Sequence, residues 1–359
     1  MKGAAAAPGL QSMPPTRHSN TMNDALIPGG NGGQPGGNGG RTLVYVHGRH
    51  FKPAAADLMD ICIAAMRRGI ERDVPQLVEL FDGTDKRIAY YGDLNNAFLR
   101  EIGQRYDPDL DLGDRRNALH GLCSIEKRKN FGVGRYDRLP GKTAIAEFAA
   151  DLAAPLLGTL GLSEKIIAKI AVDLAEYWNG NSDFGPRIRE RVRNTICEAA
   201  GSDGRVMLVS HGTGCIVCYD ALWELSHDPE FRKDFEGRKI DLWLTLGAPL
   251  GDSTVQRKLL GARKKGRARY PTNIVSWHNL SAEDDYMCHD NTVANDFRQM
   301  LKLKLVSCIK DYRIYNLAVR YGKSNPHSSV GYLVHPRVAR ILADWVAQNE
   351  MASVPRRTY

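Results

Sequence analysis

The residues with the clearest chemical potential lie in one stretch of the chain. Val206 to Val209 predict a short buried strand, and residues 215–226 predict a helix. Between them stands Ser210-His211-Gly212-Thr213-Gly214, a sharp turn whose small residues let strand and helix approach closely. A turn of this kind exposes a catalytic nucleophile at its apex. Here the apex is Gly212, which offers no nucleophile.

This turn resembles the G-x-S-x-G nucleophile turn of the α/β-hydrolase superfamily, in its serine lipase and esterase branch. The resemblance covers roughly residues 41–350. Gly212 stands where the family has serine, and Ser210 replaces the first glycine of the motif. Further stretches match the family in its chain order: His47-Gly48-Arg49, the run TLGAPL at 245–250, Ser281 to Tyr286, and Asn325 to Leu333.

The resemblance implies hydrolysis of a small-molecule or lipid carboxylic ester, with no metal and no organic cofactor. His327 would be the general base and Asp285 the acid that orients it. Because the register of the acid loop is not defined to one residue, Asp284 is the alternative acid. Glu283 is adjacent, and Asp290 is a weaker candidate.

The resemblance also implies an oxyanion hole, made by the backbone N–H groups of Arg49 and Thr213. Neither neighbouring hydroxyl replaces the missing serine. Ser210 lies two residues before the apex, and its side chain should point elsewhere. We expect His211 to be a packed structural residue. His50 either lines the oxyanion region or contacts solvent, and no role is assigned to His278 or His289.

The glycine at position 212 leaves three hypotheses open. The chain is an esterase in which a natural or engineered substitution removed the serine, and it is then inactive or severely impaired. Alternatively, it is a pseudoenzyme whose cleft binds an acyl or ester ligand without turnover. In the third, His327 activates a water molecule for slow direct hydrolysis. Loss of the serine in such a site costs on the order of 10⁶ in kcat.

Short apolar runs alternate with helical patterns along most of the chain. Strands are predicted at 42–46, 87–91, 206–209, 242–246, 273–277 and 312–319, and helices at 55–69, 186–200, 215–226 and 336–348. This alternation predicts an α/β fold with a mostly parallel sheet and helices on both faces, and the resemblance makes it an α/β-hydrolase fold over 41–350.

A helical insertion is predicted at 93–183, where the simple alternation needs far fewer residues. It contains a charged, loop-like part at 126–138 and amphipathic patterns at 143–157 and 164–178. Two interpretations remain: helices packed against each other and the core, or a cap (lid) whose apolar face lines an acyl pocket. An interfacial membrane helix is less favoured, because these faces are acidic as much as basic.

Composition restricts the remaining alternatives. The 359 residues include 35 Gly, eight of them in Pro28 to Gly40, so residues 1–40 are expected to form a disordered Gly-rich leader. Residues 351–359 are expected to form a tail. A hydrophobic content of 43% and a charged content of 25% exclude disordered, collagenous and coiled-coil classes.

Partners and location follow from charge, apolar runs and cysteines. The net charge of +8 favours a nucleic-acid partner only weakly, and none is predicted. Residues 257–269 hold seven basic residues, expected to form a solvated loop, with peripheral membrane contact as the alternative. Seven scattered Cys predict free thiols. With neither a signal peptide nor a membrane span recognised, we expect a cytoplasmic protein.

Overall fold

The computed structural model describes residues 40–141, 171–201, 204–288 and 292–348. The chain divides into two units, Met1–Asn38 and Gly39–Tyr359, and the described residues all belong to the second. The predicted helix at 143–157, the tail at 351–359, His289, Asp290 and all of the leader except Gly40 lie outside them.

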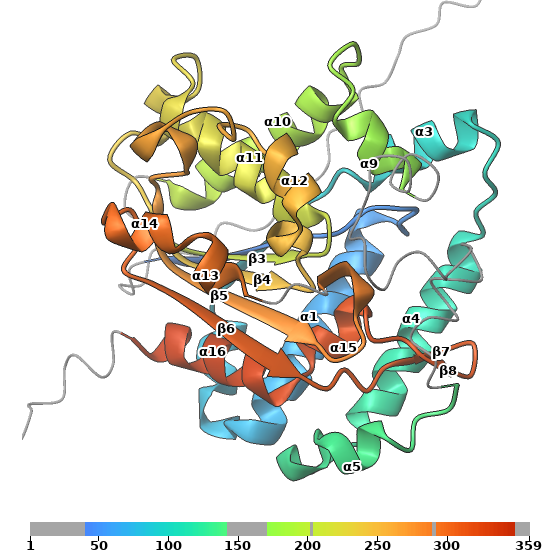
Figure 1. Ribbon diagram of the computed structural model, residues 1–359. Helices are drawn as coiled ribbons and strands as arrows, with labels where there is room; N and C mark the ends of the chain where they lie inside the picture. The colour runs from blue at the N-terminus through green and yellow to red at the C-terminus, as the bar shows by residue number, and fades with distance from the viewer. Residues whose placement is uncertain (1–39, 142–170, 202–203, 289–291, 349–359) are drawn as a thin grey trace, which may run out of the picture. The chain divides into compact units, whose positions relative to one another are not determined.

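Six parallel strands form the main sheet in the order β2-β1-β3-β4-β5-β6 (Figure 1). They are β1 (Arg41–Val46), β2 (Asp85–Ala89), β3 (Arg205–His211), β4 (Ile240–Leu246), β5 (Ile274–Ala282) and β6 (Cys308–Ile314). A small antiparallel pair, β7 (Val319–Arg320) and β8 (Lys323–Ser324), follows β6.

Helices connect these strands and extend the fold at both ends. The α-helices are α1 (Ala55–Asp73), α2 (Val78–Asp82), α3 (Gly92–Glu101), α4 (Pro108–Cys123), α5 (Val133–Tyr136), α9 (Val172–Tyr177), α10 (Phe184–Ala200), α11 (Gly214–His227), α12 (Ser253–Lys258), α13 (Val293–Asp296), α14 (Arg298–Lys302), α15 (Ser329–Leu333) and α16 (Pro336–Ala347). The 3₁₀ turns are η1 (Pro75–Leu77), η2 (Arg128–Asn130), η4 (Arg232–Phe235), η5 (Pro249–Gly251), η6 (Gly266–Arg269) and η7 (Tyr286–Cys288).

Both faces of the sheet are buried by helices. Successive side chains of a strand point to opposite faces. In β1, Leu43 and Tyr45 therefore pack in one core cluster with α1 and α16, whereas Val44 and Val46 pack in the other with α10 and α11. Figure 1 shows these two pairs of helices on opposite sides of the sheet. The predicted α/β architecture with a mostly parallel sheet is confirmed.

The predicted strand boundaries are wrong where polar residues enter a strand. β5 continues to Ala282, five residues beyond the prediction, because its Asn279 is buried but satisfied: Thr245 donates to its Oδ1 at 2.8 Å. At the edges, β2 begins at Asp85 and β6 at Cys308, and both carry charged residues that an apolar-run search misses. After Ile314 the chain leaves the sheet, so the predicted strand 312–319 was placed too late.

The end of β6 is explained by a buried amide. The Asn316 Nδ2 group donates to the carbonyls of Pro326 and Ser328, both at 2.9 Å, which folds the chain back toward α15. Val319 then pairs with Ser324 in the short β7–β8 hairpin. This return places residue 327 beside the ends of the central strands.

The segment between β2 and α10 contains helices in its described parts. α4 was not predicted, because only Asp111 and Leu122 of its residues are buried and no apolar stripe marks it. It begins instead on a local signal: Asp107 accepts from the Asp109 and Leu110 N–H groups, and Pro108 follows at the first helical position. The predicted loop 126–138 contains η2 and α5. Of the predicted helix 164–178, the described part forms α9. In the described part of the chain, no helix is both long and apolar enough to cross a membrane.

Candidate functional site

The candidate site lies where the sheet order reverses. From β1 the chain crosses to β2 on one side, and β3 pairs with β1 on the other, with Val46 opposite Ser210. The carboxyl ends of β1 and β3 therefore lie side by side while their connections diverge. In open parallel sheets such a switch point is where ligands bind.

Gly212 forms the turn that follows β3. Its φ of +56° lies in the left-handed region that favours glycine, and its N–H donates to the Leu246 carbonyl at 2.9 Å. α11 begins two residues later at Gly214. The predicted turn between strand and helix is therefore sharp and is tied to the end of β4.

An imidazole and a carboxylate meet beside this turn. The His327 Nδ1 atom lies 3.0 Å from both Asp285 oxygens. The Asp285 side chain is fully buried, whereas that of His327 is 36% exposed. Asp285 also accepts from the Tyr332 hydroxyl at 2.6 Å and from the Met287 N–H at 3.1 Å. The carboxylate is thus held by several donors, and it holds the imidazole in turn.

The imidazole is directed at Gly212. A β-carbon built on Gly212 would lie 3.0 Å from His327 Nε2. The other side of the pair is closed by Gly247, at φ +56°, where a β-carbon would lie 2.8 Å from Asp285 Oδ2 and 3.1 Å from His327 Nδ1. The ends of β3 and β4 therefore fit closely around the His327–Asp285 pair, and a side chain at residue 247 would push them apart.

The other acidic candidates are engaged elsewhere. Asp284, at φ +60°, accepts from the Tyr136 hydroxyl at 2.5 Å. Burial, together with this carboxylate, raises the pKa of Tyr136. Glu283 pairs with Arg313 at 2.9 Å. Of the two aspartates that sequence left as alternatives, the structure places Asp285 against the imidazole.

The two backbone groups assigned to an oxyanion hole also come together, but one N–H is already used. The Arg49 N–H donates to the Thr213 hydroxyl at 2.8 Å. The Arg49 side chain lies 3.5 Å from Asp173 of α9, and the His50 N–H donates to the same carboxylate at 2.6 Å. The Lys52 ammonium donates to the carbonyls of Arg49, His50 and Phe51. This loop is consequently fixed by the segment that precedes α10 and by its own lysine.

Two neighbouring side chains have structural partners. His211 Nε2 lies 3.0 Å from the His327 carbonyl oxygen, and burial lowers the His211 pKa well below its ordinary value. The Ser210 hydroxyl turns into the core, where the Trp243 indole N–H donates to it at 2.9 Å. Neither side chain takes the place of a nucleophile at residue 212. His50 is exposed at φ +72°, and His278 packs edge-on against Tyr312.

Several supporting residues were missed by sequence reasoning. Tyr332, Asp173 and Lys52 carry no motif, and each acts across a long separation in the chain or through a backbone carbonyl. His47 was noted only as part of a turn. Its Nδ1 bonds the Gly48 carbonyl at 2.8 Å, and its Nε2 accepts from the Tyr91 N–H at 3.1 Å, so the ring is neutral with a defined tautomer. Burial lowers the His47 pKa in agreement.

α9 is anchored to α11 by a buried carboxylate, Asp220. It accepts from the Tyr177 hydroxyl and from the Leu260 N–H, both at 2.8 Å. Burial raises its pKa to about 7 from 3.8. Because the folded state holds this proton more tightly than the unfolded chain, stability is fully present below about pH 4 and is lost as pH rises through about 7.

We therefore expect Asp220→Asn to stabilise the protein, and more at pH 8 than at pH 5. The amide keeps one acceptor and one donor for the same partners and carries no charge. The difference between the two pH values should be about 2 kcal/mol in the free energy of unfolding. Urea unfolding at both pH values measures it, and exposed Asp344→Asn serves as the control. An equal effect at both pH values would contradict the assignment.

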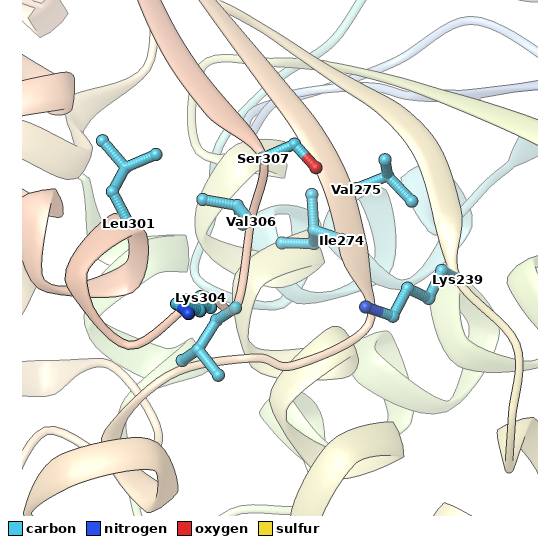
Figure 2. Close-up of a pocket in the computed structure, with 8 residues that line it drawn as sticks. Lys239, Ile274, Val275, Leu301, Lys304, Val306 and Ser307 are labelled. Carbon is cyan, nitrogen blue, oxygen red and sulfur yellow. The ribbon is translucent and has the colours of Figure 1, made fainter.

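Two other surface features lie away from Gly212. A groove of about 500 Å³ at the start of β5 has an apolar floor between Lys239 and Lys304 (Figure 2). It opens at the amino end of the strand, opposite the site. The basic cluster 257–269 spans α12 and η6, and residues 263–268 are exposed, as expected for a solvated loop. Neither feature contributes a residue to the arrangement around Gly212.

The arrangement has the parts of a proton-transfer site with an anion-stabilising corner. An imidazole held by a buried carboxylate can accept a proton at its free nitrogen, Nε2. Backbone N–H groups at the start of α11 and after β1 can stabilise negative charge on oxygen. No protein-family model matches the chain, and comparisons with curated proteins and with solved structures give no match.

Proposed function

We propose that the protein carries a serine-hydrolase-type site for carboxylic esters on an α/β-hydrolase fold, with Gly212 at the position of the nucleophile. The observation that carries this proposal is the direction of His327: its Nδ1 is bound by Asp285, and its Nε2 is 3.0 Å from where a β-carbon of residue 212 would stand. As it stands, the chain is inactive or severely impaired in acyl-enzyme chemistry, because glycine has no group to acylate.

Each proposed role follows from a contact. His327 is the general base, and Asp285 orients its ring and stabilises the imidazolium. The N–H groups of Arg49 and Thr213 are the oxyanion donors. The substrate class is a small-molecule or lipid ester, and the segment between β2 and α10, which contributes Asp173, is the proposed cap.

A second candidate is a pseudoenzyme that binds an acyl or ester ligand without turnover. The Arg49–Thr213 hydrogen bond favours it, because a hole filled by the protein's own hydroxyl needs no reacting oxyanion. Direct water attack has less support, because the His327 ring already packs against the position that a β-carbon of Gly212 would take.

Covalent labelling tests the proposal. The Gly212→Ser protein should react with a fluorophosphonate probe, giving a single adduct on residue 212 by peptide mass spectrometry. The unmodified protein and Gly212→Ser/His327→Ala should stay unlabelled over the same time, since one lacks the hydroxyl and the other its base. A folded Gly212→Ser protein that resists the probe would reject the serine-hydrolase reading and favour the binding role.

A further inference from the structure

We propose that the Thr213 hydroxyl occupies the oxyanion hole of this site, so that Thr213, besides Gly212, limits how well the site can stabilise a negatively charged oxygen. The inference rests on the proposed function. It adds a second, independent restraint on catalysis, which a serine at position 212 would not remove.

The contact that carries the inference joins the two predicted halves of the hole. The Arg49 N–H points at Thr213 Oγ1 at 2.8 Å, and Thr213 is only 4% exposed. An oxyanion bound between these two residues would have to accept this same N–H. A donor has one direction, so the hydroxyl and the oxyanion compete for it.

The hydroxyl has no other function in its helix. Thr213 is the residue that caps the start of α11, yet its side chain makes no capping hydrogen bond there. It reaches across to a residue 164 positions earlier in the chain. Removing the hydroxyl therefore leaves the start of the helix without a lost cap.

The loop around Arg49 cannot easily move instead. The His50 N–H is bound by the buried Asp173 at 2.6 Å, and the Lys52 ammonium binds the Arg49 carbonyl. Rotation of the Thr213 side chain is the smaller change. Thr213 is consequently a positioning residue, whose rotamer decides whether the Arg49 N–H faces an incoming carbonyl or the protein's own hydroxyl.

A substitution series at Thr213 in the Gly212→Ser protein tests the effect on catalysis. Thr213→Ala removes the competing acceptor and should raise kcat for a p-nitrophenyl ester about five- to tenfold, with KM changed less than twofold. Thr213→Ser keeps the hydroxyl and should match the parent within about twofold. Thr213→Val keeps a methyl group in the same place and should give no gain.

A second measurement tests the hydrogen bond without activity. In the unmodified Gly212 protein, amide hydrogen exchange at Arg49 should be at least about tenfold faster after Thr213→Ala than after Thr213→Ser. Unchanged exchange in the alanine variant would overturn the inference, as would an unchanged or lower kcat in an active Gly212→Ser background. If all Gly212→Ser variants lack both turnover and labelling, the proposed function itself fails, and the catalytic role of Thr213 falls with it.

Discussion

Replacing Gly212 with serine should give the protein p-nitrophenyl ester hydrolysis at least about 10³-fold above that of the unmodified chain, because the missing nucleophile is worth on the order of 10⁶ in kcat. The base and its carboxylate are already in place. The full factor is not expected, because His327 Nε2 lies 3.0 Å from the new β-carbon and must withdraw by a few tenths of an ångström. Initial rates at pH 8 measure the gain.

Gly212→Ala is the matched control for this substitution. Both side chains add a β-carbon at φ +56°, where an L-residue is strained by about 1–2 kcal/mol, so both variants should lose similar stability. Only serine adds a hydroxyl that can be acylated. Equal ester hydrolysis by the serine and alanine variants would show that the new activity does not come from residue 212.

Asp285→Asn, introduced into the Gly212→Ser protein, should lower kcat by about 10⁴-fold. The Asp285 carboxylate accepts from His327 Nδ1 and is also bound by the Tyr332 hydroxyl and the Met287 N–H. An amide in this place no longer fixes the productive tautomer or stabilises the imidazolium that forms on proton transfer. The kcat for the same ester, with folding checked by circular dichroism, gives the result.

Asp284→Asn separates the two acidic candidates. Asp284 binds Tyr136 instead of the imidazole, so its amide should change kcat by less than about threefold, well below the loss expected for a triad acid. His327→Ala should reduce kcat at least as far as Asp285→Asn does, and the two losses should not add, because they disable one unit. The reverse order of the two aspartate variants would reassign the acid.

Local periodicity predicted most of the fold but failed where burial and polarity part company. The buried strand at residues 42–46 and the helix that became α1 were readable, because apolar side chains repeat at the period of each element. The same criterion cut β5 short before Asn279, whose amide is satisfied only by a neighbouring strand. It also missed α4, which has almost no buried face and starts on the cap at Asp107.

The candidate site was predictable in its parts more than in its contacts. Chain order and the resemblance indicated that the turn at Gly212, the acid loop and His327 belong together, and the sheet order explains why their strand ends meet. Tyr332 and Asp173 could not be found in this way. Each supports the site through one side chain from a distant segment, and no pattern in the sequence records such a contact.

The sequence by itself determined the parallel α/β architecture and the glycine at the apex of the turn after β3, because both depend on residue type and local spacing. Only the tertiary structure decided that Asp285 faces the imidazole and that the Thr213 hydroxyl meets the Arg49 N–H. The physical reason is directional: within a loop, one residue of register turns a side chain to a different neighbour. That orientation is set by the packing of segments far apart in the chain.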